Sequence, residues 1–545
     1  MLIDEKDIIK SYTKALGKFG SQRKACEDIG VPRTTMQDIL KRHKLDAAGN
    51  KAPVQPTFGV SLPHRPKSVN TRKGEVRRFI FSAAQDDTAV HTEFLRNLEA
   101  YASYLGAELM IGGFTYDKSL YEDHDVNKAW YHPSVQRYLV KSSIVINDSL
   151  AFCGEMNTLP TAVNPLAGFE VYTRHRSGIF PHAKVQLQSI PTMKGFPPKM
   201  NMTTGAVTMP NYVKKRAGII AGFHHVIGAV LVEVDGEGDW FARHLIADED
   251  GDFQDLNTIV EDGQVSTGWR VEAINWGDIH YPYFDPNVAA FGWGAASDGA
   301  SVPDEASVML DVLEPTYQFL HDVSDFRARN HHELRDPHVQ FERWFHREED
   351  IRKCFRDMSH FLETFRRPFS EVVVVESNHD LAFDRWLREA DWKTDPVNAE
   401  LYLEANLRKL QAIKEEDAEF SVLQWAMLRE DAGDISDVQF LKEDQSFVIC
   451  AKADDTGIEC GMHGHLGANG SRGTPRQFTR MGPKANTGHT HSPSIIDGIY
   501  TAGTSSLLHM GYNKGLSSWS HSHVVTYPNG KRTIVTMKNG KWRAE

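Results

Sequence analysis

The segment "EVVVVESNHD" at residues 371–380 constrains the fold of this chain more than any other. Its four consecutive valines are typical of a short strand that is buried on both faces of a sheet. In open α/β sheets, chemistry takes place in the crevice beyond the carboxyl ends of the strands. Asn378 and His379 follow the last valine after only two residues, so the pattern predicts that both side chains lie at such a site.

Length and composition indicate a globular protein of several domains. A chain of 545 residues exceeds one ordinary core, so two to four domains are expected. No apolar run is long enough to cross a bilayer and the first ten residues are charged, which predicts no membrane span, no signal peptide and a cytoplasmic location. Five cysteines, an odd number without a CxxC pair, argue against a disulfide framework and favour a reducing compartment.

The net charge of −12 is unevenly distributed along the chain. The first 78 residues contain 17 Lys and Arg against 8 Asp and Glu, whereas the remainder contains 44 against 65. A basic head on an acidic body favours a nucleic-acid contact at the N-terminus. The alternative is a solvated, charged arm without a partner.

Residues 1–44 carry the pattern of a small helical module. Apolar residues recur at helical spacing, and Cys26, Gly30 and Met36 occupy positions that resemble the small, turn and apolar positions of a helix-turn-helix. The second helix of that motif would present four side chains to duplex DNA: Arg33, Thr34, Gln37 and Lys41. A helical packing or dimerisation module remains the alternative.

Three further segments follow this module. Residues 45–76 are rich in proline, glycine and basic residues, which is typical of an extended basic linker. Residues 77–265 form a mixed α/β domain that begins with a βαβ unit and shows no phosphate-binding loop and no repeat at solenoid periods. A scaffolding, oligomerisation or DNA-guiding role is the expectation for it. Residues 266–545 carry the polar motifs.

Five short polar blocks occur in this last segment in a fixed order. They are "DIH" at 278–280, "HDVSD" at 321–325, "SNHD" at 377–380, "HGH" at 463–465 and "GHTH" at 488–491. Their order resembles that of the calcineurin-like metallophosphoesterases, over residues 268 to about 510. The resemblance implies an α+β fold, a four-layer αββα sandwich, and phosphoester hydrolysis by a water that two divalent metal ions activate.

The resemblance also implies a role for each residue. One metal ion would take Asp278, His280 and His491, and the other would take Asn378, His463 and His489, with Asp322 as the bridge between them. His379 would protonate the leaving oxygen, and Asp325 would orient its imidazole. Mixed carboxylate, imidazole and amide ligands suit manganese first, with iron or zinc as alternatives.

Several residues depart from the family pattern or leave a choice open. His321 and Ser377 stand where the family has glycine, which indicates a divergent branch or a weakened site. His465 is the alternative to His463, as a substrate contact or a supporting residue. His321, His331 and His332 are interpreted as ordinary polar surface residues. The loop residues Arg472, Arg476, Arg480 and Lys484 either meet phosphates or are solvated.

Taken with the basic N-terminus, these motifs predict a hydrolase of phosphoester bonds that acts on duplex DNA. The layout resembles early DNA-transfer and host-genome-degrading nucleases of tailed bacteriophages, kin to the SbcD-type repair nucleases, and the resemblance implies a homo-oligomer in the host cytoplasm. Helical insertions between the blocks are interpreted as a cap or an assembly surface. The alternatives are a phosphatase or nucleotide hydrolase, and a non-catalytic DNA-binding protein with a relic metal site.

Overall fold

The computed structural model describes most of the chain. The described ranges are residues 4–43, 45, 49, 68–69, 74–117, 129–295, 307–330, 336–443, 445–452, 456–511 and 513–544. Most of the predicted linker, together with His331 and His332, lies outside them, as does the side chain of Lys41.

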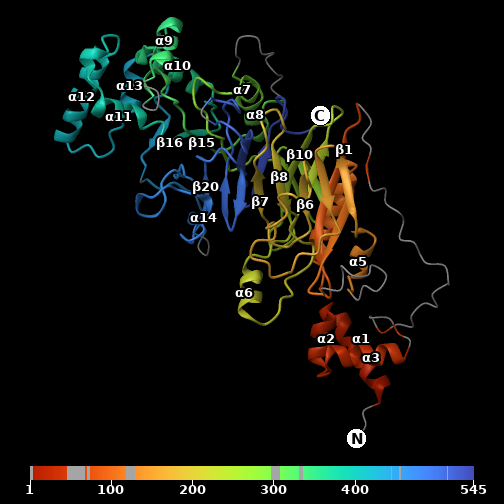
Figure 1. Ribbon diagram of the computed structural model, residues 1–545. Helices are drawn as coiled ribbons and strands as arrows, with labels where there is room; N and C mark the ends of the chain where they lie inside the picture. The colour runs from red at the N-terminus through yellow and green to blue at the C-terminus, as the bar shows by residue number, and fades with distance from the viewer. Residues whose placement is uncertain are drawn as a thin grey trace.

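The N-terminal module consists of three helices around a small apolar core (Figure 1, red). They are α1 (Glu5–Phe19), α2 (Gln22–Asp28) and α3 (Arg33–Arg42). The side chains of Asp4 and Ser21 cap the first two helices, and Gly30 takes a left-handed φ of 69° in the turn before α3. The predicted helix-turn-helix segment is therefore helical where the sequence indicated.

The body of the protein contains three large sheets. The strand order is β10-β9-β1-β2-β3 in the first and β17-β16-β15-β14-β23-β24 in the second. The third sheet has ten strands in the order β18-β19-β20-β22-β21-β7-β8-β6-β5-β4. The hairpin strands β11 (Phe253–Asp255), β12 (Thr258–Glu261) and β13 (Gln264–Thr267) form a small separate sheet.

The strands before β11 belong to residues 77–246. They are β1 (Arg77–Gln85), β2 (Glu108–Phe114), β3 (Leu139–Val140), β4 (Ser143–Asn147), β5 (Leu150–Cys153), β6 (Ser177–Phe180), β7 (Leu187–Ile190), β8 (Lys199–Thr203), β9 (Gly228–Val234) and β10 (Trp240–Ile246). Helices α4 (Thr92–Leu105), α5 (Pro133–Gln136) and α6 (Arg216–Phe223) lie between them. The predicted βαβ unit is β1-α4-β2, and its two strands are parallel.

The strands after β13 belong to residues 273–536. They are β14 (Ala273–Asn275), β15 (Tyr317–His321), β16 (Glu371–Val375), β17 (Gln439–Leu441), β18 (Val448–Ile449), β19 (Ile458–Glu459), β20 (Lys484–Thr487), β21 (Ser494–Ile496), β22 (Ile499–Thr501), β23 (Ser522–Thr526) and β24 (Arg532–Thr536). Helices in this part are α7 (Pro286–Trp293), α8 (Met309–Leu313), α9 (Pro337–His346), α10 (Ile351–Glu363), α11 (Ala382–Glu389), α12 (Ala399–Lys414), α13 (Val422–Arg429) and α14 (Pro475–Phe478).

These two parts of the chain share one topology. In the first part β1 pairs parallel with β2 and antiparallel with β9, which pairs antiparallel with β10. In the second part β14 pairs parallel with β15 and antiparallel with β23, which pairs antiparallel with β24. The order β4-β5-β6-β8-β7 likewise matches β18-β19-β20-β22-β21 in order and in every direction. The body is therefore two topologically equivalent halves.

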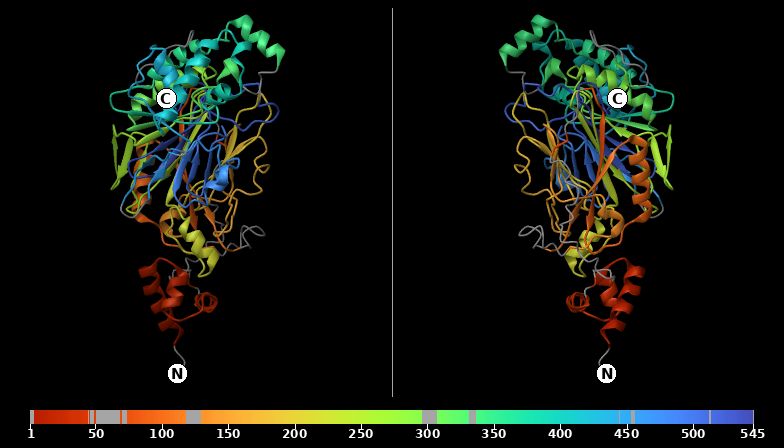
Figure 2. Two further views of the ribbon diagram at one scale, coloured as in Figure 1. Left: turned by 90° about the vertical axis from the view of Figure 1, so that its left-hand side faces the viewer. Right: turned by 90° about the vertical axis from the view of Figure 1, so that its right-hand side faces the viewer.

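The two halves meet edge to edge, where β7 pairs antiparallel with β21 through Leu187 and Ile495. The boundary predicted at residues 265/266 falls between the halves, inside β13. It does not separate independent domains, because the ten-stranded sheet runs through both (Figures 1 and 2).

The hydrophobic cores explain the layers. One core lies between the five-stranded sheet and the ten-stranded sheet, and another lies between the six-stranded sheet and the ten-stranded sheet. Helix α4 covers the outer face of the five-stranded sheet, and α7, α8, α10, α11 and α13 cover that of the six-stranded sheet. On the far face of the ten-stranded sheet, α14 and the loop at residues 156–169 supply apolar contacts.

The architecture is thus a mixed α+β fold, as predicted. Its outermost layer beside the ten-stranded sheet is thinner than the helical layer of the expected four-layer sandwich. None of the helices in the described part of the chain combines the length and the apolar composition that a bilayer crossing needs.

Candidate functional site

The predicted ligands gather where strands of the second half end. Asp278 and His280 follow β14, Asp322 follows β15, and Asn378 follows β16. These three strands are parallel neighbours, so their carboxyl ends meet at one edge of the six-stranded sheet. The remaining predicted ligands, His463, His489 and His491, come from loops after β19 and β20 in the facing sheet.

Four side chains form a compact cluster that can hold a metal ion. The ligand atoms of Asp278, His280, Asp322 and His491 all lie within 4.8 Å of one another. His491 Nε2 is 3.0 Å from Asp278 Oδ2 and 2.9 Å from His280 Nε2. Each of the four side chains is buried, and Asp278 and His280 are fully inaccessible to solvent.

The second predicted ligand set lies on the other side of Asp322. His463 Nε2 is 3.4 Å from Asp322 Oδ2, the same separation as that between His280 Nε2 and this oxygen. The rings of His463 and His489 are 5.2 Å apart. The carboxylate of Asp322 therefore lies between an imidazole of the first predicted ligand set, His280, and an imidazole of the second set, His463.

Several ligand atoms in this centre are buried without a hydrogen-bond partner. They are Asp278 Oδ1, Asp322 Oδ1, Asn378 Oδ1, both ring nitrogens of His463, and His491 Nδ1. Each such polar atom costs about 1–3 kcal/mol when nothing satisfies it. A concentration of unsatisfied donors and acceptors on residues that typically ligate metals fits a centre that is completed by cations.

Backbone strain is concentrated at the same residues. His280, Asp322, His489 and His491 all have positive φ values, between 45° and 72°. Non-glycine residues in this region are uncommon and cost roughly 1–3 kcal/mol each, so they persist where the surrounding structure holds them. The strain aims these side chains into a common centre.

Electrostatics favours neutral imidazoles and a charged bridge. Burial lowers the pKa values of His489 and His491 to about 4 and holds that of His463 well below its usual range. Burial raises the pKa of Asp322, but the imidazoles of His463, His379 and His280 outweigh it and hold this pKa well below its ordinary value. Neutral imidazoles and an ionised carboxylate are the forms that bind metal ions.

His379 has a different environment from that of the ligands. Its Nδ1 lies 3.3 Å from Asp325 Oδ1, and its ring is 4.6 Å from that of His280. Burial lowers its pKa, but the carboxylates of Asp322 and Asp325 raise it to about 9. The predicted acid and its orienting carboxylate are therefore in contact, and the imidazole is held in its protonated form.

The structure corrects the interpretation of His321 as a surface residue. Its side chain is fully buried, its ring is 5.6 Å from that of His463, and neither ring nitrogen has a hydrogen-bond partner. Burial lowers its pKa to about 4. The sequence around His321 did not indicate that its side chain is buried, because the residues that surround this side chain come from the facing sheet.

The other replaced glycine, Ser377, is accommodated by hydrogen bonds. Its Oγ donates to Asp380 Oδ2 at 2.8 Å and accepts from the Asp380 amide at 3.1 Å. Asp380 Oδ1 in turn accepts from the Ser324 amide at 3.0 Å. The serine thus ties the turn that carries Asn378 and His379 to the loop after β15.

The two histidines of the "HGH" block have separate partners. His463 faces Asp322, whereas His465 Nε2 pairs with Glu443 Oε1 at 2.6 Å. This geometry favours His463 as the ligand and gives His465 a supporting position. Of the four basic loop residues singled out in the sequence, Arg472 lines the cavity above the centre, whereas Arg476, Arg480 and Lys484 are not among the lining residues.

This cavity has a volume of about 560 Å³, within the range of small-molecule sites. Its lining residues are Asp322, Asn378, His379, Arg472, Gly473, Thr474, His489, Thr490, His491 and Trp519. None of them belongs to α9, α10, α12 or α13, so among the described residues these insertions do not cap the centre. Their place on the outer face of the six-stranded sheet leaves the assembly interpretation open.

The corresponding crevice of the first half lacks the ligands. Asp278 forms a parallel bridge with Thr504, and the equivalent bridge in the first half joins Ala83 to Ala206. Ala83 pairs with Gly112 in β2, and neither residue has a ligating side chain. His182 does follow β6 as His489 follows β20, but its ring contacts the carbonyl oxygen of Leu159 at 3.2 Å.

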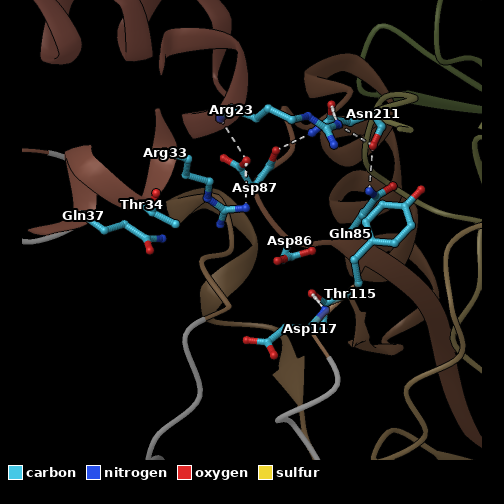
Figure 3. A pocket seen from close by; sticks show the side chains of 11 residues that line it. Arg23, Arg33, Thr34, Gln37, Gln85, Asp86, Asp87, Thr115, Asp117 and Asn211 are labelled. Carbon is cyan, nitrogen blue, oxygen red and sulfur yellow. Dashed lines mark hydrogen bonds and ion pairs between the residues drawn. The ribbon is translucent and has the colours of Figure 1, made fainter. Parts of the chain in front are cut away.

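The N-terminal module covers this crevice of the first half (Figure 3). Arg23 and Asn211 are hydrogen-bonded across the contact at 2.8 Å. The carboxylate of Asp87 accepts hydrogen bonds from the amides of Gln22 and Arg23, and lies 3.6 Å from Arg33.

Three predicted DNA-reading residues face this contact. Arg33, Thr34 and Gln37 line a pocket of about 320 Å³ together with Asp86, Asp87 and Asp117. In this arrangement the helix face predicted to read DNA lies beside an acidic wall, with Thr34 exposed and with Arg33 and Gln37 half-buried. DNA contact by these residues stays a prediction, and the neighbouring carboxylates would repel a polyanion in this position.

Fold and site together define a two-half α+β protein with one buried histidine–aspartate centre suited to divalent metal ions. No family model and no solved structure matches the chain. A curated relative, "Protein A1" of Escherichia phage T5, is 41% identical over 477 residues, which cover 86% of this chain and 83% of that protein. The chain therefore belongs to the family of protein A1 of phage T5, and this relationship supports a bacteriophage origin.

Proposed function

We propose that the protein is a metal-dependent phosphodiesterase, and specifically a deoxyribonuclease of the metallophosphoesterase type. The observation that carries the proposal is the convergence of all five motif blocks on one buried centre. Its four-residue core lies within 4.8 Å, and its unsatisfied atoms belong to the predicted ligands. The pair of facing sheets around this centre agrees with the sandwich expected of that family.

The donor set determines which ions suit the centre. Asp278, His280 and His491 would hold one ion, Asn378, His463 and His489 the other, and Asp322 would bridge them. Carboxylate, imidazole and amide donors together suit manganese, with iron or zinc as alternatives. Two such ions would supply Lewis acidity, which neutralises phosphoryl oxygens and activates water.

The chain's own residues would perform the remaining tasks. His379, protonated beside Asp325, is positioned to give a proton to the leaving oxygen, and the contact at 3.3 Å keeps its ring oriented. Asp325 also lies 3.3 Å from His280 Nδ1, so one carboxylate orients both a ligand and the acid. Arg472, at the rim of the cavity, would bind a phosphate.

DNA is the favoured substrate for two reasons. The basic excess of the chain lies in its first 78 residues, and the module there has helix-turn-helix organisation. The relationship to a phage protein is compatible with a place in the host cytoplasm, where the proposed nuclease would act on host DNA or during DNA transfer. The second candidate, a phosphatase or nucleotide hydrolase, draws support from the docked module, whose α3 residue Arg33 lies 3.6 Å from the carboxylate of Asp87.

A homo-oligomer remains part of the proposal. Helix α9 exposes Phe341, Trp344 and Phe345, each more than 60% accessible, on an insertion away from the centre. Such aromatic clusters typically mark protein contacts. Light scattering of the full chain and of a Trp344→Ala variant tests this, and two monomeric species would contradict it.

The decisive experiment compares substrates and metals. The full chain is incubated with linear duplex DNA, circular duplex DNA and a small phosphodiester, with manganese or with a chelator, beside an Asp322→Asn variant. We expect manganese-dependent cleavage of DNA by the wild type and none by the variant. Hydrolysis of the small ester without cleavage of DNA would favour the phosphatase alternative. Metal binding without any turnover would favour a relic site.

A further inference from the structure

Trp519 stands beside the proposed centre without being part of it. Its ring centroid lies 4.1 Å from that of His491, with an angle of 75° between the planes. The side chain is half-buried, and it lines the cavity together with His379 and His489. A large aromatic surface at the edge of a polar centre is unusual packing for a residue that serves only the core.

The segment that carries Trp519 is held from both sides. The Ser520 amide donates to the carbonyl oxygen of His491 at 3.3 Å, and Ser518 Oγ meets Ser492 Oγ at 2.7 Å. Thr192 of the first half exchanges two backbone hydrogen bonds with Ser517, both at 2.9 Å. The first half therefore helps to fix the segment that carries the tryptophan, which preorganises the side chain for binding.

A cation also lines the cavity. Arg472 is exposed, and no carboxylate among the described residues forms an ion pair with it. Its neighbour Gly473 donates to the carbonyl oxygen of His465 at 2.8 Å and approaches the backbone of Gly464 so closely that a Cβ there would lie 2.1 Å from its oxygen. The loop is thus tied to the "HGH" block, with the guanidinium at the rim.

An aromatic platform and a guanidinium without an ion-pair partner among the described residues line the same cavity above the proposed centre, and this combination suits a nucleotide. We propose that the cavity holds a nucleobase subsite, in which an unpaired base of the substrate strand stacks on Trp519 while Arg472 neutralises the adjacent phosphate. The proposal rests on the proposed phosphodiesterase function and names its substrate as a strand with an accessible base.

The base must be unpaired because a base inside a duplex already has neighbours on both faces. Stacking on a protein side chain requires the base to leave that stack or to be single-stranded from the start. Every base offers a π-face, so this subsite selects for a nucleobase without selecting its identity.

The test uses two single-stranded oligonucleotides with the same phosphate backbone. One contains thymidine throughout, and the other contains abasic tetrahydrofuran residues throughout. Loss of a stacked base typically weakens an interaction about 5- to 150-fold. With manganese, we expect the wild type to prefer the thymidine strand by a ratio in this range. In Trp519→Ala this preference should fall to near unity, and in Trp519→Phe it should largely survive.

Two controls separate stacking from indirect damage. Leu516→Ala removes an exposed apolar side chain from the same segment and should leave the preference unchanged. If Trp519→Ala slows both strands equally and keeps their ratio, the tryptophan only supports His491, and the subsite does not exist. Equilibrium binding of both strands to a His379→Ala variant gives the same ratio without turnover. If the wild type cleaves neither strand but still binds the thymidine strand more tightly, the proposed function is wrong and the subsite stands.

Discussion

Replacement of Asp87 by asparagine should release the N-terminal module and strengthen DNA binding. Asp87 is only 3% exposed and lies at the contact between the module and the first half. Its carboxylate accepts from the first two amides of α2 and faces Arg33 at 3.6 Å. Asparagine keeps the size of the side chain but removes its charge and one acceptor oxygen.

The magnitude follows from these contacts. A hydrogen bond to a charged group contributes about 1.5–3 kcal/mol, and a partly exposed ion pair adds about 0–1 kcal/mol. Burial raises the pKa of Asp87, which shows that its charged form also carries a desolvation penalty, so the lower part of the range applies. A loss of about 2 kcal/mol corresponds to a roughly 30-fold shift toward the released module.

Fluorescence anisotropy with a labelled duplex and a chelator measures the consequence without cleavage. Where the docked state predominates and excludes DNA, the Kd should fall about 10- to 30-fold, and its salt dependence should steepen as more phosphates are contacted. The control is Asp431→Asn, which removes the same charge at an exposed position in the helical insertion.

One result would refute this reasoning. Hydrogen exchange can establish whether the amides of Gln22 and Arg23 have lost protection in the Asp87→Asn variant. If they have, and the DNA affinity still matches that of Asp431→Asn, then the face of α3 that bears Arg33 does not bind DNA. The module would then serve as a packing element.

Three further predictions concern the centre and the first half. His379→Gln should still bind manganese in calorimetry but should lose about 10²–10⁴-fold in turnover. Asp322→Asn should lose both manganese binding and turnover. If the two variants lose manganese binding to the same extent, His379 is a ligand. Manganese at about 100 times its Kd should stabilise the wild type by about 2.7 kcal/mol in urea unfolding, and a similar gain in Asp278→Asn would exclude this centre as the binding site. Arg243→Met removes the guanidinium that lies 2.6 Å from Glu233 and 2.5 Å from Asp255, leaving these buried carboxylates only Arg78 and the Tyr101 hydroxyl as partners, and should lower the unfolding free energy by about 3–5 kcal/mol. Burial raises the pKa of Glu233, but Arg243 outweighs burial and lowers this pKa. The stabilisation by the Glu233 carboxylate is therefore present above pH ~4.5 and is lost as the pH falls through the folded pKa. The destabilisation caused by Arg243→Met should shrink in acid, and a pH-independent destabilisation would contradict the ion-pair explanation.

Local patterns in the sequence determined much of this protein. The valine run predicted a buried strand that ends on a site, and β16 ends at Val375, three residues before Asn378. The helical module and the β1-α4-β2 unit also follow from periodicity. These features depend on neighbouring residues, whose spacing directly reports which face is buried.

Only the tertiary structure decided the relation between the two halves. Strand order and direction match throughout, yet the sequence carries no visible repeat, because a topology tolerates almost any apolar residue at a buried position. The pairing of β7 with β21 joins residues about 300 positions apart. No local pattern encodes that edge, so the sequence could not show that one sheet continues across the predicted boundary.

The same distinction applies within the candidate site. The resemblance of the five blocks singled out Asp278, Asp322 and His491, and the structure brings the ligand atoms of these residues within 4.8 Å of one another. The burial of His321, the position of Trp519 and the contact of α3 with the first half were not predictable. Each of these depends on which distant segment lies opposite, and that is decided by the packing of sheets and loops rather than by the residues on either side in the chain.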